Sequence, residues 1–204
     1  MHRYSGIMIC LVLLIFSVIP AAQASPNVES RIVSAIAWIE GQQVSNSVYT
    51  GFARGVSFPH NQTVYVEDQA LIAFALSDYH STHNDVQYDN LLERAAKFIM
   101  SARTEKGDFY EYYDLRNGEW RHYGDLHGWN AYAVAGLATA AYKISSKSYD
   151  KRVFWLPIEA RLKDCVYVFI DRQRHDGAWL FRQSSSAAYE ALTRENALWL
   201  VGLV

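Results

Sequence analysis

The fold is decided by the stretch WNAYAVAGL at residues 129–137, because DQALIAFAL at 68–76 and ENALWLVGL at 195–203 align with it without gaps. Each stretch has a side-chain amide in second place, then Ala, then an apolar run that ends in Leu. The three amides, Gln69, Asn130 and Asn196, stand 61 and 66 residues apart, so the chain repeats itself. These runs are apolar nearly all round, which is typical of helices that are buried on most sides.

A second helical element precedes each run and ends near a glycine that is followed closely by an aromatic residue. These pairs are Gly51 with Phe52, Gly107 with Phe109, and Gly177 with Trp179. Glycine is favoured just past a helix end because it adopts positive φ at little cost. The pattern predicts outer helices near 28–44, 86–104 and 156–174, and inner helices near 67–80, 128–144 and 190–204. Within 109–120, Asn117-Gly118 between aromatic flanks predicts a short hairpin.

Two layers of alternating helices, the inner one more apolar, describe an all-α fold, an α/α-toroid built of about three helical hairpins. The amide at the start of each inner helix recurs, which favours a structural role, and we expect it to bond backbone groups. The chain stops inside an apolar run at Val204. We therefore expect 25–204 to be a partial or half toroid, C-terminally incomplete, with self-association through the open C-terminal edge as an alternative.

Several motifs resemble known toroid families. Residues 173–179, QRHDGAW, are similar to the Gln-x(n)-Gly-x-Trp turn of terpenoid cyclases. EDQAL at 67–71 and ENALW at 195–199 resemble inner-helix openings of six-hairpin glycosidases and sugar epimerases, and GDFYEYYD at 107–114 resembles their Gly-Phe-Tyr-x-Tyr segment. The resemblance implies a toroid that acts on carbohydrate or, in the cyclase alternative, on a prenyl substrate. No Asp-x-Asp-Asp run of the cyclase kind is present.

The composition limits the kinds of binding partner that we expect for this chain. The 204 residues carry 19 basic and 21 acidic side chains, a net charge of −2, which disfavours binding to nucleic acid through a basic surface. Residues 1–24 have the pattern of a secretory signal peptide: Arg3, an apolar run over 7–19, and Ala-Gln-Ala at 22–24. We expect a secreted protein, extracellular or in the cell envelope, with no stable membrane span after cleavage. Cys165 then has no partner for an internal disulfide and is predicted to be a buried thiol.

The aromatic residues, 14 Tyr, 9 Phe and 6 Trp, exceed what packing of a small core requires. The loops before the inner helices are expected to gather stacking rings and polar groups at one rim, which suits a sugar pocket. The predicted substrate-binding residues are Trp129, Tyr112, Tyr113, Trp120 and Tyr123.

Glycoside hydrolysis needs two carboxyl groups across the scissile bond. The candidate catalytic residues are the carboxylates Glu67, Asp68, Asp125 and Glu195, with His127 as the acid/base of an epimerase. An acidic residue in the first turn of a helix also stabilises the helix terminus, so a capping role stays open for each carboxylate. No metal-ligand spacing and no Gly-rich phosphate loop occur, so we expect neither a metal nor a cofactor.

The sequence favours a secreted carbohydrate-active protein, glycosidase-like or epimerase-like, whose partner is a carbohydrate substrate or ligand. Two alternatives remain: a terpenoid-cyclase-like toroid, and a non-catalytic binding or scaffold module.

Overall fold

The computed structural model describes residues 26–55, 57–83, 86–122, 128–145, 152–169, 173, 182–183 and 189–190. Its helices are α2 (Pro26–Gly41), the 3-10 turn η1 (His60–Gln62), α3 (Val66–His83), α4 (Asp89–Ser101), α5 (Trp129–Ser145) and α6 (Arg152–Phe169). Its strands are β1 (Gln43–Ser45), β2 (Thr50–Phe52), β3 (Thr63–Tyr65), β4 (Tyr112–Asp114), β5 (Glu119–Arg121), β6 (Arg182–Gln183) and β7 (Tyr189–Glu190). The chain divides into two compact units, residues 1–39 and 40–204, and the described part of the first is residues 26–39 of α2.

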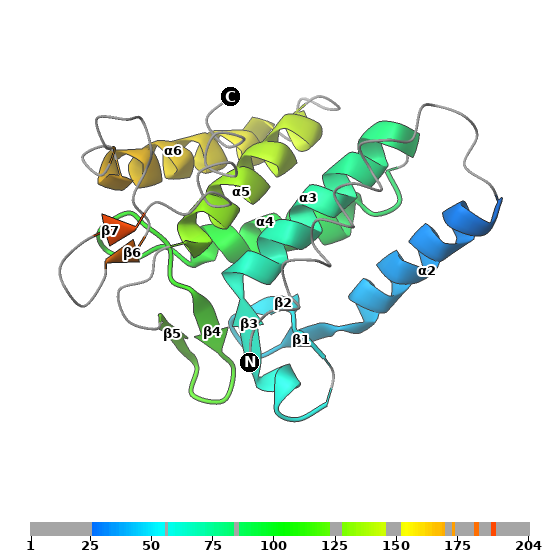
Figure 1. Cartoon of the computed structure of the whole chain (residues 1–204), viewed down its shortest axis with the longest axis horizontal. Coiled ribbons are helices and arrows are strands. Elements are labelled where there is room, and N and C mark those ends of the chain that lie inside the picture. The colour runs from blue at the N-terminus through cyan, green and yellow to red at the C-terminus, as the bar shows by residue number, and fades with distance from the viewer. Residues whose placement is uncertain are drawn as a thin grey trace. The chain divides into compact units, whose positions relative to one another are not determined.

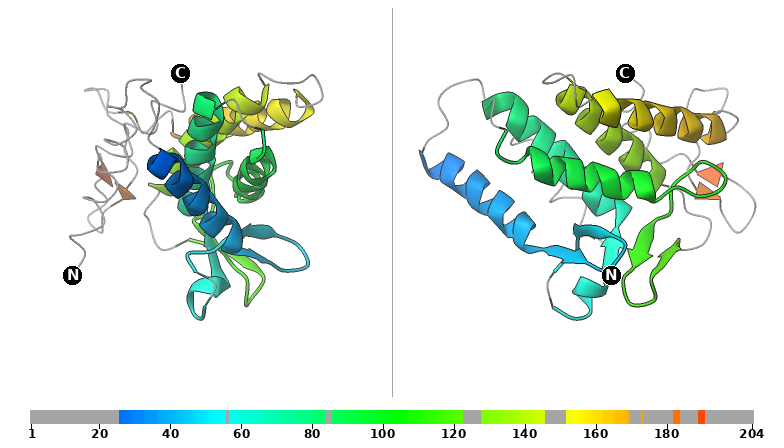
Figure 2. Two further views of the ribbon diagram at one scale, coloured as in Figure 1. Left: turned by 90° about the vertical axis from the view of Figure 1, so that its right-hand side faces the viewer. Right: turned by 180° about the vertical axis from the view of Figure 1, so that it is seen from behind.

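The second unit has the predicted two-layer arrangement. Helices α3 and α5 pack side by side, α4 packs against both, and α6 packs against α5. Figure 1 shows α3 and α5 beginning near the same end, and Figure 2 shows α4 and α6 on one side of that pair. The predicted inner helices at 67–80 and 128–144 are therefore α3 and α5, and the predicted outer helices at 86–104 and 156–174 are α4 and α6.

The two inner helices approach closely because small residues lie at their crossing. A Cβ placed on Gly136 would lie 2.7 Å from Ala70 Cα and 2.8 Å from Ala70 Cβ. Such distances are below van der Waals contact, so α5 meets α3 backbone to backbone at this point. The small residues Ala70 and Gly136 thus set the separation of α3 and α5.

Burial differs between the inner helices. Every residue of α5 from Trp129 to Leu137 is buried, as an all-round apolar helix requires. In α3 the buried set includes Ala70, Ala73 and Leu76, whereas Leu71 is 38% exposed. The apolar pattern of α3 thus includes residues that are exposed, Leu71 and Ala75 among them.

Two of the three recurring amides, Gln69 and Asn130, bond backbone groups, as predicted, and Asn196 lies outside the described residues. Gln69 is fully buried, its Oε1 accepts the Phe52 N–H at 3.0 Å, and its Nε2 donates to the Phe52 carbonyl at 2.7 Å. The same Nε2 lies 3.3 Å from the Tyr65 carbonyl. The side chain thus ties the Gly51-Phe52 turn to the start of the inner helix that follows it.

In the second repeat, two side chains make the corresponding hydrogen bonds to the backbone of the turn. Asn130 Oδ1 accepts the Phe109 N–H at 2.9 Å, and the neighbouring Trp129 Nε1 donates to the Phe109 carbonyl at 2.6 Å. Asn130 has one methylene fewer than glutamine, and the Trp129 indole supplies the second bond. The departure of Trp129 from the acidic residue found at this place in the other repeats thus has a structural counterpart.

Short strands surround the starts of the inner helices. The predicted hairpin is β4–β5, closed by Gly118 at φ +70°, and β3 adds a third antiparallel strand to it. A second hairpin, β1–β2, was not predicted: the outer helix expected at 28–44 ends at Gly41. Asn46 explains the turn, since its Oδ1 accepts the N–H groups of Val48 and Tyr49 at 2.9 and 2.8 Å.

Cys165 is fully buried on α6, with Sγ 3.8 Å from Asn130 Oδ1, which confirms the predicted buried thiol. The predicted signal peptide at 1–24, the predicted turn at 177–179 and the predicted third inner helix at 190–204 lie outside the described residues, apart from Glu190 in β7. No described helix combines the length and the apolar character needed to cross a bilayer.

Candidate functional site

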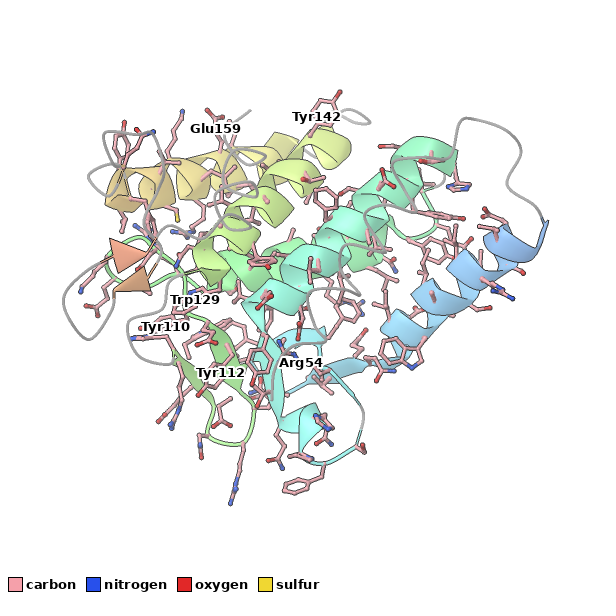
Figure 3. All side chains as sticks on the ribbon, in the orientation of Figure 1. Arg54, Tyr110, Tyr112, Trp129, Tyr142 and Glu159 are labelled. Atoms are coloured by element: carbon pink, nitrogen blue, oxygen red, sulfur yellow. The ribbon has the colours of Figure 1, made fainter. Side chains whose placement is uncertain are left out.

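The rim of the inner helices is organised by strand β3, which runs directly into α3. Its register places Tyr65 opposite Tyr112, and Tyr112 opposite Arg121, across the three-stranded sheet. Successive side chains of a strand point to opposite faces, so these residues share one face and Val64, Tyr113 and Trp120 share the other. Figure 3 shows Arg54, Tyr112, Tyr110 and Trp129 at the end of the unit where the sheet meets α3 and α5.

An ion pair with an aromatic support lies at the first turn of α3. Arg54 Nε donates to Asp68 Oδ2 at 2.6 Å, and its Nη2 donates to Oδ1 at 3.2 Å. The guanidinium carbon lies 3.8 Å from the centre of the Tyr65 ring, a cation–π geometry. We call Arg54, Tyr65 and Asp68 the rim cluster.

The electrostatics of the rim cluster favour the charged guanidinium. Burial lowers the pKa of Arg54, but the hydrogen bond and the charge of Asp68, with smaller contributions from Tyr65 and Glu67, outweigh burial and raise it. The side chains of Arg54 and Asp68 are 48% and 24% exposed, so the cluster is accessible to a ligand from solution. A planar guanidinium held by a carboxylate presents its remaining N–H groups in a fixed direction.

Glu67 and Asp68 are both half-buried in the first turn of α3. Acidic side chains there are stabilised by the positive helix terminus. The hydrogen bonds of Asp68 go to Arg54 and not to the exposed N–H groups of the helix. Asp68 therefore holds Arg54 in place over Tyr65.

Tyr113 and Trp120, two of the predicted stacking residues, lie on the inner face of the sheet. Their rings contact each other at 4.9 Å, and Tyr49 contacts them at 4.6 and 5.2 Å. Tyr113 is 2% exposed, and its hydroxyl oxygen accepts a hydrogen bond from Asn46 Nδ2 at 3.1 Å. In this arrangement the two rings join β1–β2 to the three-stranded sheet.

Trp129 and Tyr112 are also largely covered, at 6% exposure each. Tyr112 packs against Tyr65 with ring centres 5.4 Å apart, and the Trp129 ring stacks near His122 at 6.4 Å. His122 is exposed and also approaches Tyr110 at 6.1 Å. The exposed groups at this rim thus include His122, which the sequence interpretation places in the rim loop, and Arg54, which it did not single out.

The remaining predicted site residues, Tyr123, Asp125, His127 and Glu195, lie outside the described residues. The structure thus brings Asp68 together with Tyr65 and Arg54, and it leaves the convergence of carboxylates from different repeats as a prediction. Among the described residues, no three His, Cys, Asp or Glu side chains are grouped so as to hold a metal ion.

No protein-family model matches the sequence, and no curated protein matches it. Solved structures do match. A possible member of glycoside hydrolase family 105 from Salmonella enterica matches with a TM-score of 0.67 at 10% identity, over 90% of this chain and 48% of its own. The fold is a partial α/α-toroid. The match confirms the predicted resemblance to six-hairpin glycosidases at the level of fold.

Two further toroids extend the similarity. The unsaturated glucuronyl hydrolase of Bacillus sp. GL1, responsible for degradation of glycosaminoglycan, has a TM-score of 0.61 at 13% identity, over 90% of this chain and 50% of its own. The cellobiose 2-epimerase of Spirochaeta thermophila has a TM-score of 0.55 at 16% identity, over 84% and 43%. The chain thus spans about half the length of the toroids it matches.

Proposed function

We propose that this chain is part of a toroid that binds and processes carbohydrate, as a glycosidase-like or epimerase-like enzyme. The observation that carries the proposal is the rim cluster: a carboxylate and a guanidinium lie against an aromatic ring at the start of an inner helix. The similarity of the fold to carbohydrate-active toroids supports the same substrate class.

The rim cluster has the chemistry for holding a sugar. Carboxylate oxygens accept, and guanidinium N–H groups donate, hydrogen bonds to hydroxyl groups, while aromatic rings cover the apolar faces of sugars. Arg54 and Asp68 already fix each other, so a ligand meets polar groups whose directions are set in advance. Ordering of side chains on binding then costs less free energy.

Hydrolysis requires a second carboxyl group, about 5–5.5 Å away for a retaining enzyme or about 6.5–9.5 Å for an inverting one. We propose that Glu67 or Asp68 supplies one group, and that Asp125 or Glu195 supplies the other. In the epimerase alternative, His127 moves a proton next to a carbonyl. Hydrolysis and epimerisation give different products, so a single set of assays distinguishes the two reactions.

The test uses the full chain with a panel of neutral and acidic oligosaccharides. Binding is measured by calorimetry, hydrolysis by new reducing ends, and epimerisation by NMR of the sugar. We expect Glu67→Gln or Asp68→Asn to lower turnover at least tenfold, while Asp78→Asn, an exposed carboxylate on the same helix, leaves it unchanged. Absence of both binding and turnover across the panel would overturn the proposal.

A scaffold role is the second candidate, because both oxygens of Asp68 are engaged by Arg54. It predicts that Asp68→Asn lowers the melting temperature and leaves sugar binding intact. Measuring both quantities on the same variant separates the two functions.

We also propose that the protein is exported after removal of residues 1–24. Expression of the full chain in a secreting host, followed by mass spectrometry of the exported protein, tests this. We expect a mature N-terminus at Ser25, and retention of residues 1–24 in the exported protein would contradict it.

A further inference from the structure

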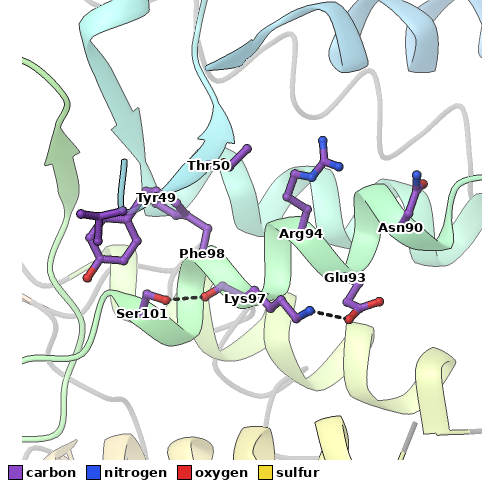
Figure 4. Close-up of a pocket in the computed structure, with 9 residues that line it drawn as sticks. Tyr49, Thr50, Asn90, Glu93, Arg94, Lys97, Phe98 and Ser101 are labelled. Atoms are coloured by element: carbon purple, nitrogen blue, oxygen red, sulfur yellow. Dashed lines mark hydrogen bonds and ion pairs between the residues drawn. The ribbon is translucent and has the colours of Figure 1, made fainter. Parts of the chain in front are cut away.

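A groove of about 330 Å³ lies between the β1–β2 hairpin and the outer helix α4 (Figure 4). Val48, Tyr49 and Thr50 line one wall. The other wall is formed by the polar face of α4 with Phe98, and none of the rim-cluster residues takes part. The volume lies at the lower end of the range of about 300–1,000 Å³ that is usual for small-molecule sites.

The charges of the groove leave one cation without a partner. Lys97 Nζ pairs with Glu93 Oε1 at 2.7 Å, one turn away on α4. Arg94 is half-buried in the groove and forms no ion pair or side-chain hydrogen bond with any residue that the structure describes. The three charges sum to +1, and Arg94 carries the excess. Figure 4 shows Arg94 and Asn90 projecting from one side of α4, and the Lys97–Glu93 pair on the adjacent side.

The hairpin wall of the groove is held in position. The Tyr49 ring contacts Phe98 at 6.5 Å and Tyr113 at 4.6 Å, and Asn46 Oδ1 accepts the Tyr49 N–H. A Cβ on Gly51 would lie 2.6 Å from Val64 Cγ1, so the strand that carries Thr50 sits directly on the sheet. The groove is thus formed before any ligand arrives, with a half-buried aromatic ring at one side.

We propose that this groove is a second saccharide site, which binds the carboxylate of an acidic sugar through Arg94. A guanidinium binds a carboxylate through two parallel hydrogen bonds, and a half-buried one without a counter-charge gains most from doing so. The Asn90 amide and the Thr50 hydroxyl provide partners for sugar hydroxyls beside it. The choice of a sugar over an acidic peptide rests on the proposed function, and on the Tyr49 ring that lines the same groove.

The test titrates the full chain with three probes: a galacturonic acid trisaccharide, the neutral galactose trisaccharide, and a triglutamate peptide. Binding is followed by calorimetry at about 50 and 500 mM salt. Binding in the groove itself is followed by the NMR shift of the Arg94 side chain in protein with labelled arginine. We expect the acidic trisaccharide to shift the Arg94 resonance and to bind more weakly at high salt. Arg94→Gln is expected to weaken this binding by about tenfold or more. Arg116→Gln, an exposed arginine in the β4–β5 turn, serves as the matched control.

The outcomes separate this site from the rim. Arg54→Gln alters the rim cluster and leaves the Arg94 shift in place if the groove binds independently. An unchanged affinity in folded Arg94→Gln, checked by circular dichroism, would overturn the groove proposal and leave the rim proposal standing. Equal binding of triglutamate would overturn the assignment to a sugar. Turnover lost in Asp68→Asn with the Arg94 shift retained would support both sites.

Discussion

Replacing Gln69 by methionine tests whether the recurring amides hold the repeat together. Methionine keeps the length of the side chain and removes both the carbonyl and the NH₂ group of the amide. The Phe52 N–H and carbonyl, which bond Gln69 at 3.0 and 2.7 Å, are then left buried without their partner. Each orphaned group costs about 1–3 kcal/mol, so the free energy of unfolding is expected to fall by about 2–6 kcal/mol.

The assay is urea unfolding of the full chain, followed by circular dichroism and by tryptophan fluorescence. With a slope of about 2 kcal/mol per molar urea, the midpoint should drop by about 1–3 M. Gln43→Met, on the exposed strand β1, is the matched control and should change stability by less than about 0.5 kcal/mol. Equal midpoints for the two variants would refute the structural role of the amide.

Trp129→Phe extends the same test to the second repeat. It removes only the donor to the Phe109 carbonyl, which lies 2.6 Å from Nε1, and leaves the Asn130 bond in place. One orphaned acceptor should cost about 1–3 kcal/mol, with a further loss from the smaller ring. A loss of sugar binding at unchanged stability would instead show that Trp129 serves as a ligand platform.

Further outcomes follow from packing and charge. Gly136→Ala forces the two inner helices apart and should cost about 1–3 kcal/mol in thermal unfolding, whereas Gly41→Ala, with no atom near the added methyl, should be neutral or slightly stabilising. Asp164→Asn removes the carboxylate that lies 3.0 Å from Arg103 and 3.6 Å from Arg161. Burial lowers the pKa of Arg161, and the charge of Arg103 lowers it further, whereas the charge of Asp164 raises it. Without the carboxylate, Arg103 and Arg161 repel each other, so the variant should melt at a lower temperature. Added salt screens this repulsion and should restore part of the lost stability.

The helical layers and the amide bonds could be predicted because they repeat in the sequence. Gln69 and Asn130 stand at equivalent places, and a residue that recurs in each repeat indicates a contact that each repeat makes. The all-round apolar character of the inner runs likewise indicated burial on most sides, which α5 shows from Trp129 to Leu137. Periodicity is visible in the local sequence, so it predicts the helices and the amide bonds that recur with it.

The rim cluster could not be predicted, because it depends on a loop and on a register. Arg54 lies in a loop without periodicity, and its bond to Asp68 spans 14 residues. The pairing of β3 with β4 decides that Tyr65 faces Tyr112 while Tyr113 faces inward. That pairing joins distant segments, and a shift of one residue would exchange the two faces.

The amide bonds also bear on how the chain folds. They join positions 17 and 21 residues apart, so the Gly51-Phe52 and Gly107-Phe109 turns each close on the helix that follows within a short loop. Loops of this length close at low entropic cost, and contacts of low sequence separation form early. Each hairpin can therefore acquire its turn before its neighbours have docked. Folding is then expected to proceed hairpin by hairpin, with the amide protons of Phe52 and Phe109 among the first to be protected from exchange.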